Sequence, residues 1–201
     1  MLMKVNVSPA PFNKLNIRHY NAGLSYEDIE ELIDLCQYAK GDPNKPGFQC
    51  PIFDEDSNNI LKEFDHPVVK RLEQSFVNAC QTYWNIVVDH KVTGWIYVSW
   101  TDMEKDLLPQ GKEKEIYPFW HSHTSNHDCY RLSGVLYLSL PDGAETTKFS
   151  NNPDLSKNDF FNLPLIKNEW FIFPSMMPHL PGGPGKTNKM RICVAADYWI
   201  K

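Results

Sequence analysis

Two histidines separated by a single residue, His121 and His123, are the first residues whose types and spacing suggest chemistry. They lie in the segment YPFWHSHT, whose aromatic composition is typical of a β-strand. Because side chains alternate along a strand, both imidazoles are expected on one face, with Ser122 on the other. Two imidazoles on one face offer two nitrogen ligands to a divalent metal ion, and His179, in a loop after the strand-like segment WFIF, is the natural third.

Arg191 begins the last strand-like segment, MRICVAADYW, which is otherwise apolar until Asp197. A guanidinium at the edge of an apolar barrel needs an anionic partner, and it can bind a carboxylate through two parallel hydrogen bonds. No acid close to it in the sequence is an obvious partner. The partner is therefore either a distant Asp or Glu or the carboxylate of a ligand. Tyr137, in LSGVLYLSL, could contact the same carboxylate, although buried tyrosines commonly bond to protein groups.

Two amphipathic helices are expected in the first half of the chain. Ser25 and Asp28 have the spacing of a capping box, and the apolar residues after them recur at helical intervals, which predicts a helix from Tyr26 to about Ala39. A second helix should follow Asp65 as its N-cap, carry Pro67 in its first turn and end near Asn85. Both helices need a sheet against which to bury their apolar faces.

From residue 88 onward the pattern changes to short segments rich in β-branched and aromatic residues. The expected strands are 92–101, 116–123, 132–140, 145–149, a short run near 160–163, 170–173 and 190–199, after one short N-terminal strand at 15–20; residues 50–61 have no clear pattern. Short strands without intervening helices indicate a sandwich, jelly roll or barrel. We expect the stretches 117–149 and 170–199 to form opposite walls of one small barrel, with the metal between them.

Composition and charge argue against several classes of partner. The chain has 201 residues, a net charge of −5 and no basic stripe, which predicts one domain and argues against a nucleic-acid partner. We expect residues 1–90 to be an extended segment with supporting helices and residues 91–201 to be the β core. No apolar run approaches the ~20 residues of a membrane span, and no signal peptide is evident. The five cysteines show no metal-ligand spacing, so buried, unpaired cysteines in a cytoplasmic protein are expected.

The order HSH, RLSGVLYLS, GAETTKF, WFIFPSMMPH and MRICVAADYW resembles the double-stranded β-helix core of the iron(II)- and 2-oxoglutarate-dependent oxygenases, in particular their prolyl-hydroxylase-like branch. The resemblance covers about residues 92–200. It implies a mainly β fold, a jelly roll similar to that of the cupins, with helices supporting one sheet. It further implies that His121 and His179 are ligands of Fe(II), and that Arg191, helped by Tyr137, binds the far carboxylate of the co-substrate 2-oxoglutarate. Gly143, Thr146 and Phe149 match the family's middle segment.

One position departs from the family pattern. Where the family has an aspartate or glutamate ligand, this chain has His123, so the usual two histidines and one carboxylate become three histidines. Alternatively Asp128 or Asp102 supplies an oxygen ligand, and His127 is a further candidate.

The resemblance implies hydroxylation of a small molecule or of a peptide, such as one with a prolyl residue; it does not define the substrate or the oligomeric state. Two other interpretations stay open. The chain could be a cupin-like metal enzyme with three histidines that does not use 2-oxoglutarate, or a jelly roll that binds a carbohydrate or protein and is not an enzyme.

Overall fold

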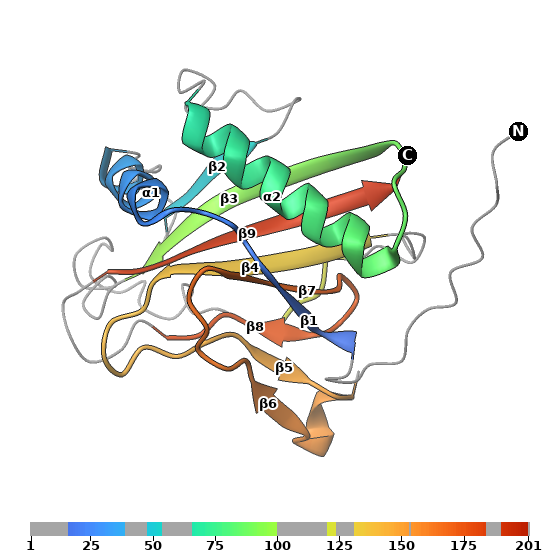
Figure 1. Ribbon diagram of the computed structural model, residues 1–201. Coiled ribbons are helices and arrows are strands. Elements are labelled where there is room, and N and C mark those ends of the chain that lie inside the picture. The colour runs from blue at the N-terminus through green and yellow to red at the C-terminus, as the bar shows by residue number, and fades with distance from the viewer. Residues whose placement is uncertain are drawn as a thin grey trace, which may run out of the picture.

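Two helices cover one face of a six-stranded antiparallel sheet, and a three-stranded antiparallel sheet lies beyond its other face (Figure 1). The structure is a computed structural model that describes residues 16–38, 48–53, 66–99, 120–123, 131–152, 154–183 and 190–200. None of the helices in these ranges has the length and apolar character needed to cross a membrane.

Helix α1 spans Tyr26–Tyr38 and begins where the sequence predicted. The amide of Asp28 donates to Ser25 Oγ at 3.1 Å, and the amide of Ser25 donates to Asp28 Oδ2 at 3.0 Å, which confirms the capping box. Arg71 of the second helix also pairs with Asp28, and mainly through this hydrogen bond it lowers the pKa of that carboxyl group. The cap therefore also joins the two helices.

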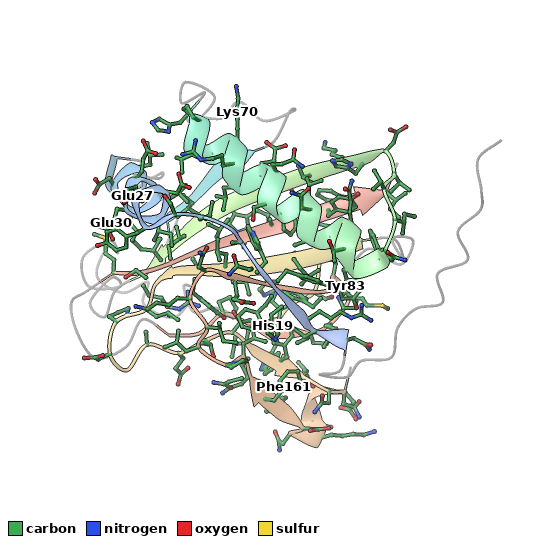
Figure 2. The ribbon with its side chains drawn as sticks, in the orientation of Figure 1. His19, Glu27, Glu30, Lys70, Tyr83 and Phe161 are labelled. Carbon is green, nitrogen blue, oxygen red and sulfur yellow. The ribbon has the colours of Figure 1, made fainter. Side chains whose placement is uncertain are left out.

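Helix α2 spans Pro67–Trp84 and packs Val68, Leu72 and Phe76 toward the large sheet. Its N-cap is His66 and not Asp65, which corrects the prediction. Pro67 has no amide hydrogen, so the first amide to be satisfied is that of Val68, which donates to His66 Nδ1 at 3.5 Å. Figure 2 shows the exposed Lys70 on the side of α2 that points away from the sheet, and the exposed Glu27 and Glu30 on α1.

The large sheet has the strand order β1-β7-β4-β9-β3-β2. Its strands are β1 (Arg18–Asn21), β2 (Phe48–Phe53), β3 (His90–Ser99), β4 (Arg131–Ser139), β7 (Glu169–Pro174) and β9 (Arg191–Ile200). Strand β2 overlaps the start of the stretch 50–61, in which the sequence showed no clear pattern. Pro51 lacks an amide donor and is tolerated here because β2 is an edge strand, with a register shift between Pro51 and Phe53.

The small sheet has the order β6-β5-β8, with β5 at Lys148–Ser150, β6 at Phe160–Asn162 and β8 at His179–Leu180; a 3₁₀ turn, η3, at Leu155–Lys157 precedes β6. Strand β5 begins three residues later than predicted. Residues 145–147 bond instead to neighbouring loops: the amide of Glu145 donates to the carbonyl of Gly183, and the carbonyl of Thr147 accepts from the amide of Leu163.

Strands from the stretches 117–149 and 170–199 lie next to one another in both sheets. This corrects the expectation that the two stretches form opposite walls of a barrel. Strand β4 of the first stretch lies between β7 and β9 of the second, and β5 of the first pairs with β8 of the second. Each strand therefore finds a partner from the other stretch. The two sheets form an open jelly roll.

Alternation along β4 and β9 divides the core in two. Ile192, Val194 and Tyr198 of β9 face the helices, whereas Cys193 belongs to a second apolar cluster that also contains Phe149 and Phe173. This second cluster includes residues of both sheets and so lies between them. Residues at odd positions of β9, beginning with Arg191, consequently face the interior between the sheets.

Candidate metal and carboxylate site

His121, His123 and His179 form one cluster in which a ligand atom of each ring lies within 4.8 Å of those of the other two. The ring centroids of His121 and His179 are 4.3 Å apart, and those of His123 and His179 are 4.9 Å apart. Three neutral imidazoles at this spacing can converge on one divalent metal ion. The structure thus brings together the three histidines that the sequence singled out.

The backbone that holds the histidines differs from the prediction. Residues 120–123 are not part of a regular strand; His121 forms a single antiparallel bridge to His179, with N–O distances of 3.0 and 2.9 Å. His179 lies on β8 and not in a loop. The amide of His123 donates to the carbonyl of Ser175 at 2.9 Å. Both histidines of the HxH motif are therefore anchored by backbone bonds to the segment that carries the third.

A backbone carbonyl and two neighbouring phenylalanines hold the ring of His179. Its Nδ1 donates to the carbonyl of Met177 at 2.9 Å, which leaves Nε2 as the ligand atom. Phe149 and Phe173 contact the ring at centroid distances of 5.6 and 5.2 Å. Burial, and secondarily the nearness of the other two imidazoles, lowers the pKa of His179 to about 3. The ring is therefore neutral at physiological pH, as a metal ligand must be.

Asp197 of β9 lies behind His123 and was not singled out from the sequence. Its Oδ1 accepts from His123 Nδ1 at 2.8 Å and from Ser133 Oγ at 2.5 Å, and its Oδ2 pairs with Arg131. Burial by itself would raise the pKa of Asp197, but the hydrogen bonds from His123 and Ser133 and the charge of Arg131 outweigh burial and lower it. Even spacing from Arg191 along β9 was the signal that could have placed Asp197 on the interior face.

A cavity of about 90 Å³ adjoins the cluster. All three histidines line it, together with Trp95, Ser133, Gly134, Val135, Thr147, Phe173, Pro181, Arg191, Cys193 and Ala195. Arg191 is fully buried, and its Nε donates to the carbonyl of Glu145 at 3.0 Å. The cavity therefore combines metal-binding nitrogens with a buried cation, an arrangement suited to an anionic ligand that chelates a metal.

Tyr137 lies beside Arg191, whose guanidinium carbon is 5.6 Å from the centre of the tyrosine ring. Its hydroxyl donates to Thr147 Oγ1 at 2.9 Å and accepts from the Thr147 amide at 2.7 Å. Burial raises the pKa of Tyr137 to about 12, so the phenol stays protonated. Thr147, which the sequence analysis did not select, lines the cavity.

The alternative metal ligands Asp102, His127 and Asp128 lie outside the described residues. Of the cysteines, Cys80 and Cys193 are buried and unpaired in disulfides, as expected.

By sequence, no family model and no curated protein matches this chain. Solved structures do match. The viral collagen prolyl hydroxylase vCPH from Paramecium Bursaria Chlorella virus-1 is 11% identical with a TM-score of 0.63, and the match covers 99% of this chain and 97% of that one. HygX from Streptomyces hygroscopicus, with nickel, 2-oxoglutarate and hygromycin B bound, is 11% identical with a TM-score of 0.62, covering 92% and 83%. SnoK, a non-heme alpha-ketoglutarate-dependent carbocyclase of nogalamycin biosynthesis, is 10% identical with a TM-score of 0.62, covering 97% and 85%.

The chain has the fold of the 2-oxoglutarate-dependent oxygenases. This confirms the jelly roll that the resemblance implied. At 10–12% identity the likeness establishes the fold, and the chemistry has to be argued from the site.

Gly182 packs closely against the backbone of Glu145, the residue whose carbonyl accepts from Arg191. A Cβ atom on Gly182 would overlap the carbonyl of Glu145, which accepts from Arg191, and would lie 2.6 Å from the carbonyl oxygen of Thr146. We expect Gly182→Ala to lower the free energy of unfolding by about 1–3 kcal/mol, as overpacking does elsewhere. Chemical denaturation monitored by tryptophan fluorescence measures the change.

Gly183→Ala is the matched control, because its Cβ would meet only the Glu145 side chain at 3.9 Å, an ordinary contact. This variant should stay within about 0.5 kcal/mol of the wild type. Equal stability of the two variants would contradict the close approach of Gly182 to Glu145.

Proposed function

We propose that this protein is an Fe(II)- and 2-oxoglutarate-dependent dioxygenase in which His121, His123 and His179 bind the metal and Arg191 binds the co-substrate. The observation that carries the proposal is that a single cavity is lined by both the three-histidine cluster and a fully buried guanidinium. A buried guanidinium beside a metal site suits a ligand that is a dicarboxylate: one end chelates the metal, and the other meets the arginine.

The donor set fits a divalent transition metal. In His123 and His179 the Nδ1 atom is occupied by a hydrogen bond to Asp197 and to the carbonyl of Met177, so the Nε2 atoms are the expected ligands. Imidazole nitrogens bind Fe(II), and a three-histidine set leaves coordination positions for a bidentate keto acid and for oxygen. Replacing the family's carboxylate by His123 makes the ligand set one charge more positive.

When bound, Fe(II) and 2-oxoglutarate together would supply the oxidising chemistry that inserts one oxygen atom of O2 into a substrate C–H bond, with release of succinate and CO2. The residues of this chain bind and orient. Arg191, fixed by the carbonyl of Glu145, would hold the far carboxylate. Tyr137 bonds to Thr147, which is a polar residue in the cavity lining. Phe173, Val135 and Ala195 would exclude water.

The substrate class we propose is a small molecule or a peptide. The structural neighbours cover both kinds, since vCPH is a collagen prolyl hydroxylase and HygX was crystallised with hygromycin B. Trp95, whose ring centroid is 5.9 Å from that of His123, lines the cavity beside the metal ligands and would contact a substrate.

Anaerobic titration of the apo-protein with Fe(II) and then with 2-oxoglutarate tests the proposal. We expect Fe(II) to bind at one equivalent, and the keto acid to produce the weak visible charge-transfer band of its chelate with iron. Admission of O2 should then consume 2-oxoglutarate and yield succinate. Fe(II) binding without a band at saturating 2-oxoglutarate would contradict the proposed co-substrate.

A second candidate is a metal enzyme with three histidines that does not use 2-oxoglutarate. The donor set favours it, because three histidines with an open fourth position also form catalytic zinc sites. The same titration separates the two functions: the second candidate predicts tight Zn(II) binding, and no charge-transfer band when Fe(II) and 2-oxoglutarate are added.

A further inference from the structure

Asp197 is a buried carboxylate that neither lines the cavity nor belongs to the metal-ligand cluster. Only 2% of its side chain is exposed. It lies on β9 directly opposite Ser133 of β4 and Thr93 of β3, in the middle of the large sheet. Such a group is costly to bury unless every oxygen is satisfied, and here every donor that satisfies it comes from the vicinity of His123.

The contacts of Asp197 form a closed network around one histidine. Its Oδ1 faces His123 Nδ1 at 2.8 Å, and Ser133 Oγ donates to the same oxygen at 2.5 Å. Arg131 pairs with Oδ2, donates to the carbonyl of His123 at 2.5 Å and lies over the ring of Trp199. With its hydrogen on Asp197, Ser133 Oγ accepts from Ser175 Oγ at 2.8 Å, and the carbonyl of Ser175 accepts from the His123 amide. Backbone and ring of His123 are thus held by one set of groups.

We propose that Asp197 is the positioning residue of the three-histidine site, which fixes the tautomer and orientation of His123 through its Nδ1 atom. A carboxylate paired with arginine can only accept hydrogen bonds, so His123 must carry its proton on Nδ1. The lone pair of the His123 ring then lies on Nε2, and the negative charge of Asp197 makes that nitrogen a better electron-pair donor to a metal. This inference rests on the proposed metal site. The ligand set itself has no carboxylate, but Asp197 supplies one as the hydrogen-bond partner of the ligand His123.

His179 has a different orienting partner, the carbonyl of Met177, and two adjacent phenylalanines also contact its ring. His121 and His179 are joined by backbone bonds. His123 lies beyond this bridge, at a bend. Without Asp197, the Nδ1 atom of its ring would lose its carboxylate partner.

The tautomer is measured on the metal-free protein by long-range proton–nitrogen NMR of ¹⁵N-labelled imidazoles, with His123→Gln to assign the signals. We expect His123 to be the Nδ1–H tautomer in the wild type and to lose that preference in Asp197→Asn, since an amide can bond to either form. An unchanged tautomer in a folded Asp197→Asn protein would overturn the inference, whatever the metal does.

Metal affinity is the second readout. Fe(II) and Zn(II) dissociation constants should rise roughly 10- to 100-fold in Asp197→Asn, the usual effect of losing the partner of a metal-bound histidine. Because this variant leaves Arg131 without its counter-charge, the double variant Arg131→Gln/Asp197→Asn is measured beside it and should show the same loss. Asp28→Asn is the control: it breaks the pair of Asp28 with Arg71 on the helices and should leave the affinities unchanged.

The outcomes separate this inference from the proposed function. Wild-type affinity in both Asp197 variants would overturn the inference while leaving the oxygenase proposal standing. Metal binding that depends on Asp197, with no charge-transfer band on adding 2-oxoglutarate, would support the inference and contradict the oxygenase. A wild-type protein that binds neither metal would overturn both.

Discussion

Replacing His179 by alanine is expected to weaken Fe(II) binding by at least ~100-fold. This is a larger effect than the one expected for Asp197→Asn, which removes only the hydrogen-bond partner of a ligand. The ring supplies one of three nitrogens, and two imidazoles alone make a weak site. The bridge to His121 uses backbone atoms, with N–O distances of 3.0 and 2.9 Å, so the variant keeps the bonds that position the cluster. Anaerobic calorimetry or competition with a chromogenic chelator measures the dissociation constant.

His179 also packs against two phenylalanines, so lost stability has to be separated from lost ligation. His121→Ala removes a less buried ring of the same cluster and should cost a comparable amount of affinity. His19→Ala is the control, since that side chain is 58% exposed and bonds to Glu169 on the sheet edge. Near wild-type Fe(II) affinity in a folded His179→Ala protein would rule out the three-histidine site.

Arg191→Met should weaken 2-oxoglutarate binding about 10- to 150-fold, the equivalent of the 1.5–3 kcal/mol of a hydrogen bond to a charged group. Methionine fills much of the volume of a side chain that is fully buried, but it cannot bind a carboxylate. Arg191→Lys keeps the charge and loses the planar fork, so we expect an intermediate affinity. Titration of the Fe(II)-loaded protein, monitored by the charge-transfer band, measures both.

Fe(II) affinity serves as the internal reference for these variants, because Arg191 is not among the clustered ligands. It should remain within a few-fold of the wild type if the site is intact. Arg71→Met, which removes an exposed arginine of α2, should change neither affinity. An unchanged band in Arg191→Met would assign the buried guanidinium a purely structural function and favour the candidate that does not use 2-oxoglutarate.

The sequence by itself determined the elements that depend on near neighbours. The capping box at Ser25 and Asp28 and the apolar period of 67–84 involve contacts within a few residues, so pattern alone placed both helices. The apolar and aromatic composition of MRICVAADYW likewise predicted a strand at 190–199, and β9 lies at Arg191–Ile200. The pairing of His121 and His123 with His179 came from residue type, spacing and family resemblance, and the structure brings these rings together.

The tertiary structure decided the features that depend on register between distant strands. Asp197 meets Arg131 across 66 residues, a contact that follows from the pairing of β4 with β9. It meets His123 across 74 residues, where the amide of His123 is bonded to the carbonyl of Ser175. A shift of one residue in the pairing of β4 with β9 would turn Asp197 toward the helices, and no local pattern encodes the register. The proline of β2 is likewise acceptable only because that strand lies at an edge of the sheet. Position 182 requires glycine because the carbonyl of Glu145, 37 positions earlier, leaves no room for a Cβ atom. Local periodicity encodes which residues of a strand share a face, whereas strand pairing decides which face that is and what the residues meet there.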